Sequence, residues 1–256
     1  MRSRVGASKP PILRGKDIKR YGYQWAGKWL IATFPSRHYD INDYPAVEHW
    51  LLTFARELLL DNGFDWIAND PAHLRDYCYQ RLTQTGKHII IDGKRLQFEK
   101  NDKARKKNNN KWFETQDSIS YWEDFDKPKI IYPNMTKYLP FVFDERGFLT
   151  NQKCFILTGK SMAYLTAFFN SSLFKYCFRD SFPELQGGTR ELSKIFFDKI
   201  PVIQISKEQN ASFANAVEDI QKEFSTAKAV AIDNMIFDLY DLSAEERHLI
   251  GYIEIR

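Results

Sequence analysis

The spacing of apolar residues predicts several helices along the chain. Steps of three and four residues from Val47 to Leu58 predict a helix that ends near Asp61. Ser161 is a favourable N-cap residue and predicts the start of a helix over residues 162–169. The same reasoning predicts further helices within residues 73–82, 173–178 and 209–240, and one more after the capping box of Ser243 and Glu246.

Short runs of β-branched and aromatic residues predict strands. Ile89–Ile91 and Leu96–Phe98 flank Asp92 and Gly93, which favour a type I′ turn, so the segment should form a hairpin. The other predicted strands are Trp29–Phe34, Lys129–Tyr132, Phe141–Asp144 and Cys154–Leu157. We therefore expect an α+β fold, with a mixed or antiparallel sheet and packed helices in residues 1–205 and a helical tail over residues 206–256.

Composition narrows the class of protein. Of the 256 residues, 43% are hydrophobic and 15% aromatic, which suits a folded core and argues against a disordered chain. No stretch approaches the roughly 20 uncharged apolar residues of a membrane-spanning helix. Cys78, Cys154 and Cys177 are widely spaced and odd in number, which is typical of a reducing compartment. We therefore expect a cytoplasmic protein.

Charge is distributed unevenly along the chain. Residues 201–256 carry five basic and ten acidic side chains, whereas residues 1–200 carry 32 basic and 23 acidic ones. The basic excess is concentrated in residues 1–37 and 100–111. This distribution indicates a polyanionic partner such as nucleic acid, although a solvated basic loop would have the same composition.

Familiar catalytic motifs are incomplete in this sequence. Thr158–Ser161 resembles the end of a phosphate-binding loop, but Cys154 stands where that motif requires glycine. The Pro10–Pro11 pair follows Lys9, whereas the base-holding loop of a DNA amino-methyltransferase has Asn or Asp there. The five histidines are isolated in the sequence and form no metal-binding pair. We therefore expect the chain to perform no chemistry by itself.

Two other functions stay open on the sequence. Asp17–Lys19 and Asp92–Lys94 each have the Asp-x-Lys spacing found in magnesium-dependent nucleases, which need carboxylates for the metal beside a lysine. A metal-dependent DNA nuclease is therefore an alternative. The acidic C-terminal helices would also suit a protein-interaction domain of a defence complex.

Several segments resemble one known family. Lys103–Ser118 and Phe125–Pro133 resemble the signature of the TaqI-like C-terminal specificity domain. This domain is the target-recognition part of type IIG restriction–modification enzymes, in which one polypeptide both cleaves and methylates, and of related phage-defence methyltransferases. The resemblance extends over roughly residues 12–205, through Leu13–Tyr21, Tyr44–Val47, Ala167–Ser171, Gly188–Arg190 and Lys199–Pro201. Leu13–Tyr21 is similar to the segment that joins the methyltransferase and recognition domains, and the later segments are also similar to type I specificity subunits.

The resemblance implies a module that recognises double-stranded DNA sequence-specifically and directs the methyltransferase and endonuclease of a type IIG-like enzyme, without an active site of its own. The implied partners are double-stranded DNA and methyltransferase or nuclease domains of the same or an associated polypeptide, with no membrane. No cofactor is expected in this chain, because S-adenosylmethionine and Mg²⁺ would bind the partner catalytic domains. Whether the chain is a fragment or a free-standing specificity protein stays open.

The candidate DNA contacts are basic and amide side chains in four segments. Lysine and arginine neutralise phosphates and pair with guanine, and asparagine pairs with adenine. Glycines would allow close approach to the DNA backbone in one segment, and paired strands would hold a polar loop in another, although ordinary turns have the same residues. The candidates are Arg105, Lys106, Lys107, Asn109 and Lys111; Asn134, Thr136 and Lys137; Gln186, Thr189 and Arg190; and Arg14, Lys16 and Lys19.

Overall fold

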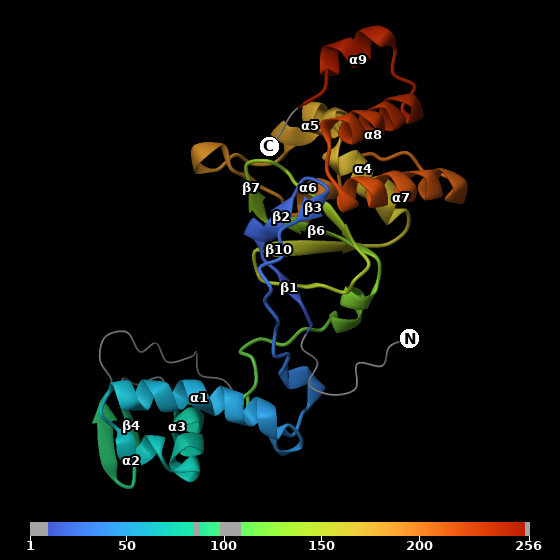
Figure 1. The fold of residues 1–256 in the computed structure, drawn as a ribbon. Helices are drawn as coiled ribbons and strands as arrows, with labels where there is room; N and C mark the ends of the chain where they lie inside the picture. Colours follow the sequence, from blue (N-terminus) through green and yellow to red (C-terminus); the bar gives the residue numbers. More distant parts are fainter. Residues whose placement is uncertain (1–9, 84–87, 98–108, 254–256) are drawn as a thin grey trace. The chain divides into compact units, whose positions relative to one another are not determined.

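A computed structural model describes residues 10–83, 88–97 and 109–253 (Figure 1). Their contacts divide these residues into two units. Unit 1 contains the described residues within 31–120, and unit 2 contains residues 10–30 and 121–253. Unit 1 is therefore inserted between two sequence segments that together build unit 2.

Unit 1 is a small helical unit with one hairpin. Its helices are α1 (Pro45–Asp61), α2 (Asp65–Ala68) and α3 (Pro71–Thr83), and its strands are β4 (His88–Ile91) and β5 (Lys94–Gln97). Asp92 and Gly93 have φ of 49° and 72°, which confirms the predicted type I′ turn. The Gln80 side chain donates to the Ile90 carbonyl and accepts from the Ile90 N–H, so it fixes the hairpin against α3.

A three-stranded antiparallel sheet forms the centre of unit 2. The strand β6 (Lys129–Pro133) lies between β10 (Cys154–Thr158) and β8 (Val142–Asp144). Every residue of β6 is buried, because both faces of this strand are covered. Ile130 packs in the helical core, whereas Ile131 packs in a second core with Leu13 and Ile18.

The remaining strands of unit 2 are short pairs at the edges of this centre. β1 (Ile12–Leu13) pairs in parallel with β9 (Leu149–Thr150), which makes the β-structure of the chain mixed. β2 (Ile18–Lys19) pairs with β3 (Gly22–Tyr23), and β7 (Met135–Thr136) pairs with β11 (Arg190–Glu191), both antiparallel. Together with the packed helices, these sheets confirm the predicted α+β class.

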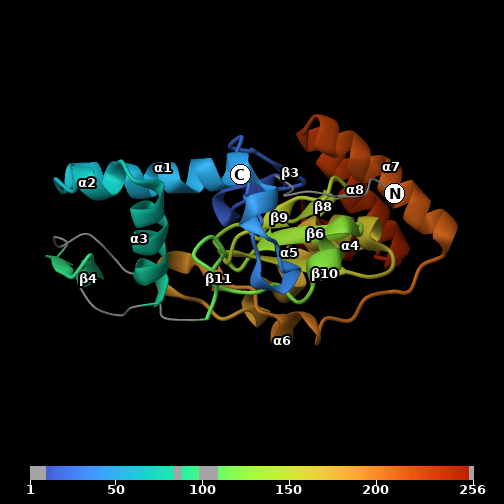
Figure 2. The same ribbon diagram turned by 90° about the horizontal axis from the view of Figure 1, so that it is seen from below.

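Helices gather beside the sheet of unit 2 (Figures 1 and 2). α4 (Met162–Asn170) packs against β6 and β8 and also contacts α7 (Lys207–Lys222) and α8 (Thr226–Leu239). The aromatic side chains of Phe141, Phe168 and Phe174 meet in the core between these elements. The other helices are α5 (Ser172–Phe178), α6 (Lys194–Phe197) and α9 (Ala244–Ile250), and Ser243 and Glu246 form the predicted capping box of α9.

The C-terminal helices share the core of the residues that precede them. Phe213 and Val217 of α7 and Ile232 and Ile236 of α8 are buried in the same cluster as Phe141. The contacts thus place α7 and α8 within unit 2, and they show no division at residues 205 and 206. A functional division into a DNA-recognition domain at residues 1–205 and a helical tail at residues 206–256 stays a prediction.

One local prediction was wrong, and one confirmed helix start has a different cap geometry from the one expected. Trp29–Phe34 forms no strand beyond a single bridge from Trp29 to Pro11; the Leu30 N–H instead donates to Pro10 and the Thr33 carbonyl accepts from Thr115. The neighbouring segment at residues 10–12 pairs only with the start of this run, so its β-forming residues do not complete a ladder. Ser161 does precede α4, but it has φ of 54° and its side chain makes no capping hydrogen bond.

One ion pair is completely buried in unit 2. Lys129 of β6 donates to the carboxylate of Asp144 on β8 and to the Phe125 carbonyl. The same carboxylate accepts from the backbone N–H groups of Arg146 and Phe148. Both charges are therefore satisfied, and removing one of them would leave the other buried alone.

The side chain of Lys175 is also buried, but its hydrogen-bonding groups are not satisfied by the residues that the structure describes. Lys175 on α5 is buried, and its Nζ has no hydrogen-bond partner within the described residues. Burial, together with the nearby charge of Arg20, lowers the pKa of Lys175 well below its usual value. Asp233, which accepts from the N–H and hydroxyl of Ser172, opposes that shift only in part.

We expect Asp144→Ala to lower the free energy of unfolding by about 3–5 kcal/mol, because the Lys129 charge would lose its partner in the interior. Urea unfolding followed by circular dichroism would measure the loss. Asp124→Ala is the matched control, since it breaks the solvent-exposed pair of Lys127 and Asp124 and should cost less than about 1 kcal/mol. Equal losses in the two variants would contradict the assignment.

We expect Lys175→Met to raise the free energy of unfolding at pH 7 by about 1–3 kcal/mol, because it removes a buried polar group without breaking a hydrogen bond. The folded pKa of Lys175 is depressed, so the part of the cost that comes from its charge is greatest at low pH and disappears as pH rises toward 10.5, where the unfolded lysine also loses its proton. Unfolding curves at several pH values would show this convergence. The exposed Lys199→Met variant should show no such trend.

Candidate nucleic-acid interface

The N-terminal segment of unit 2 is turned by an ion pair. The buried Asp17 carboxylate accepts from the backbone N–H of Arg14 and, at 3.0 and 2.8 Å, from its guanidinium. These bonds from the Arg14 side chain lower the pKa of Asp17 despite its burial. Because Asp17 and Ile18 face inward, Lys16 and Lys19 are exposed.

Two more segments, around Asn134 and Lys153, contact this turn through the Lys153 carbonyl group. A Cβ on Gly15 would lie 3.0 Å from the Lys153 carbonyl oxygen, so the two backbones approach as closely as only glycine permits. The same oxygen accepts a hydrogen bond of 2.9 Å from the Asn134 N–H. Segments around residues 15, 134 and 153 are thereby held side by side.

These segments surround a pocket of about 820 Å³. The side chains of Lys16, Lys19 and Lys153 give it three positive charges, and its lining contains no Asp or Glu. Arg20 also lines the pocket, but its guanidinium lies 3.8 Å from the buried Asp233 carboxylate, which offsets its charge. Its remaining lining residues include polar and apolar groups from the end of α7, from β7 and from the loop that follows it: Asn134, Met135, Thr136, Tyr138, Gln221 and Phe224. We call this the cationic pocket.

The three lysines of the cationic pocket are not held in ion pairs with other described residues. Within the described residues, no ion pair involves Lys16, Lys19 or Lys153, whereas the ion pairs elsewhere in unit 2 hold Lys127, Lys129, Lys194, Lys222, Lys228 and Arg247. A positive surface without compensating carboxylates attracts polyanions more strongly than a mixed one. The pocket is therefore the best candidate for contact with nucleic acid in unit 2.

A second pair of predicted loops comes together beside this pocket. β7 and β11 pair Thr136 with Arg190, so the loop at residues 134–137 lies next to the one at residues 186–190. The Lys137 side chain lies 4.0 Å from the Cβ position of Gly188, and Gln186 is exposed. The structure thus joins the predicted residues Lys16, Lys19, Asn134 and Thr136 in one pocket and places the 186–190 loop at an adjoining strand.

Two predicted arginines are engaged inside the protein. Arg190 is buried, donates to the Phe182 carbonyl, and pairs with Asp180 at 2.9 Å and Glu184 at 2.7 Å. The Arg14 guanidinium is bound to Asp17. Both side chains have structural partners, and their contact with DNA stays a prediction.

The candidates of the basic loop belong to unit 1 or lie outside the described residues. Asn109 and Lys111 are exposed in unit 1, where the Lys111 ammonium donates to the Tyr39 carbonyl. Arg105, Lys106 and Lys107 lie outside the described residues. Their contact with DNA also stays a prediction.

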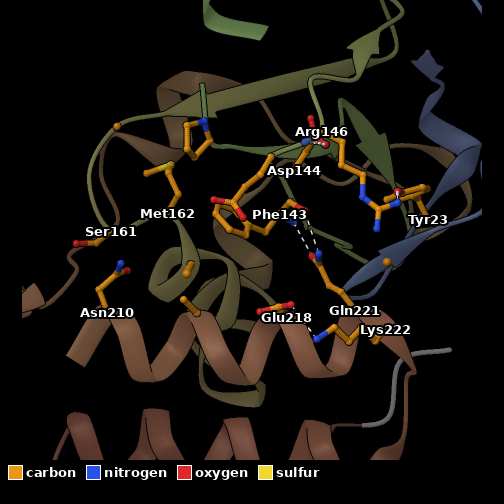
Figure 3. A pocket seen from close by; sticks show the side chains of 16 residues that line it. Tyr23, Phe143, Asp144, Arg146, Ser161, Met162, Asn210, Glu218, Gln221 and Lys222 are labelled. Carbon is orange, nitrogen blue, oxygen red and sulfur yellow. Dashed lines mark hydrogen bonds and ion pairs between the residues drawn. The ribbon is translucent and has the colours of Figure 1, made fainter. Parts of the chain in front are cut away.

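Another pocket, of about 700 Å³, has a different character (Figure 3). The Gln221 amide spans it to hold the backbone N–H and carbonyl of Phe143, and Lys222 pairs with Glu218. At one end Arg146 donates to the Tyr23 hydroxyl. Its lining contains the acids Asp144, Glu145 and Glu218 beside the bases Arg146 and Lys222, whereas the lining of the cationic pocket contains no acid.

The residues of the alternative nuclease hypothesis are separate. Asp17 belongs to unit 2 and is bound to Arg14, whereas Asp92 belongs to unit 1 and accepts from His73. Across residues 10–83, 88–97 and 109–253, no group of three His, Cys, Asp or Glu side chains is arranged to hold a metal ion. In the same ranges, no helix has the length and apolar character needed to cross a membrane.

Sequence reasoning missed Lys153, Tyr138 and Phe224 as members of the pocket. Lys153 stands alone among polar residues before β10, and Phe224 follows a helix that the sequence marks as acidic. Neither has a sequence neighbour that signals binding. Arg20 belongs to the same N-terminal segment as the predicted Arg14, Lys16 and Lys19, and its position at the pocket depends on the fold of residues 14–21.

A family model matches part of this chain. No curated protein matches the chain. Residues 80–202 match the model of the TaqI-like C-terminal specificity domain, a range that includes the Asn134–Lys137 and Gln186–Arg190 loops. The match supports a DNA-recognition role within restriction–modification enzymes. The similarity to the TaqI-like C-terminal specificity domain thus covers residues 80–202, just under half of the chain.

Proposed function

We propose that the chain is a sequence-specific double-stranded DNA recognition module that directs the catalytic domains of a type IIG-like restriction–modification enzyme. The single observation that carries this proposal beyond the family match is the cationic pocket, whose lysines come from separate segments and whose lining contains no acidic residue. Such a surface neutralises phosphates, and the nearby amide and hydroxyl groups of Asn134 and Thr136 suit base edges.

Catalysis belongs to other domains in this proposal. Methyltransferase and nuclease domains of the same or an associated polypeptide would bind S-adenosylmethionine and Mg²⁺, and this chain would have no active site of its own. It would contribute affinity for the target and fix the orientation of the DNA. A place in phage defence and in the cytoplasm follows from this function and is proposed with it.

The division of labour between phosphate and base contacts can be assigned within the pocket. Lys16, Lys19 and Lys153 are mobile ammonium groups without carboxylate partners in the described residues, and they suit phosphates. The Asn134 side chain is half-buried and makes no hydrogen bond within the described residues, while its backbone is held at both the N–H and the carbonyl. A fixed backbone with a free amide suits direct reading of a base.

We expect the triple variant Lys16→Ala, Lys19→Ala and Lys153→Ala to bind duplex DNA more weakly and with less dependence on salt. Each lost phosphate contact should reduce the slope of log K against log salt by about 0.9. Fluorescence anisotropy with one labelled duplex at several salt concentrations would measure both quantities.

The matched control replaces three exposed lysines of unit 2 that neither line the pocket nor form an ion pair within the described residues, namely Lys160, Lys199 and Lys207, by alanine. Both triple variants change the net charge equally, so only position distinguishes them. The proposal fails if the two variants bind alike, or if the unsubstituted chain shows no affinity for duplex DNA at low salt.

A further inference from the structure

The cationic pocket has more apolar surface than contact with phosphates requires. The side chains of Tyr138 and Phe224 are each 50% exposed, and Met135 is 44% exposed. Two exposed aromatic rings at a pocket with no acidic residue are unusual for a surface that only neutralises a phosphate backbone. Aromatic rings of this kind offer stacking faces to flat ligands.

The positive charge at the pocket is partly immobile. The Arg20 guanidinium donates to the Asn170 carbonyl at 3.0 Å and to the Ile253 carbonyl at 3.3 Å, and its Nε is buried without a partner in the described residues. Arg20 therefore cannot swing away to follow a ligand. Lys16, Lys19 and Lys153 supply flexible charges around this fixed one.

Polar groups at the pocket divide into occupied and free. The Gln221 amide is engaged by the backbone of Phe143. The Thr136 hydroxyl accepts from the Tyr138 N–H and keeps its own O–H as a donor. The Asn134 amide keeps both its donor and its acceptor available within the described structure. The pocket thus combines aromatic faces, a bidentate amide and unpaired cations.

We infer that the cationic pocket binds one unstacked nucleotide, with its base against Tyr138 and Phe224, its polar edge toward Asn134 and its phosphate among the lysines. A nucleotide is a flat aromatic group joined to an anion, and so it matches each of these features. The volume of about 820 Å³ lies within the range of pockets that take small ligands. This inference rests on the proposed function, because bound DNA would supply the nucleotide.

The test compares two duplexes of the same sequence, one fully paired and one with a single unpaired adenine at its centre. The unpaired base is already free of its partner, so the cost of unstacking it is smaller. The full chain should bind the bulged duplex about 10-fold more tightly, which corresponds to stacking of one base on aromatic side chains. Anisotropy titrations at one salt concentration would measure the ratio.

Variants of Tyr138 locate the preference in the pocket. Tyr138→Ala should abolish the 10-fold preference while leaving the affinity for the paired duplex within about twofold, and Tyr138→Phe should keep the preference because it keeps the ring. Tyr176→Ala is the matched control, since Tyr176 is 51% exposed on α5 and lies outside the pocket. It should retain the full preference.

Each outcome separates this inference from the proposed function. Equal affinity of the unsubstituted chain for the two duplexes would overturn the nucleotide pocket and leave DNA recognition intact. Loss of the preference in Tyr176→Ala but not in Tyr138→Ala would also overturn it. Absence of binding to either duplex at low salt would overturn both proposals. Competition by free AMP against the bulged duplex, removed by Tyr138→Ala, would support the pocket and add free nucleotides as a source.

Discussion

The docking of residues 13–21 into the core of unit 2 determines where the charges of the candidate interface lie. Leu13, Ile18 and Tyr21 are buried, and Arg14 closes the intervening turn by binding the inward-facing Asp17. Burial of these apolar side chains is the dominant favourable contribution, and the ion pair sets the direction of the chain between them. Lys16 and Lys19 face solvent as a consequence. A basic segment thus becomes a rigid part of the protein surface.

The described part of unit 2 buries one lysine with a partner and one without, and the two have opposite effects on folding stability. The pair of Lys129 and Asp144 fastens the central strand to its neighbour, with further bonds to Phe125 and Phe148. Lys175 has no equivalent and lies near Arg20, which is itself held by the carbonyl groups of Asn170 and Ile253. The burial of Lys175 without a hydrogen-bond partner in the described residues, close to Arg20 at the pocket, therefore lowers the folding stability.

Local sequence signals predicted local structure well. The Asp92–Gly93 turn, the helix ending at Asp61 and the capping box of Ser243 each depend on residues a few positions apart, and each was confirmed. Trp29–Phe34 failed because a strand also needs a neighbour, which no local pattern supplies. The cationic pocket could be predicted only in part, since Lys153 and Phe224 join Lys16 through the close approach at Gly15 and the packing of α7. Contacts between residues more than one hundred positions apart leave no periodic mark in a sequence.

The insertion of unit 1 between residues 30 and 121 has a consequence for synthesis on the ribosome. Leu13 and Ile18 are made more than one hundred residues before their core partners Ile131 and Val142. The helices and hairpin of unit 1 emerge in the interval, and their own cluster around Leu59 and Ile89 needs nothing from unit 2. Vectorial translation therefore lets the inserted unit fold first, while the N-terminal segment waits, unfolded, for the sheet that will bury it.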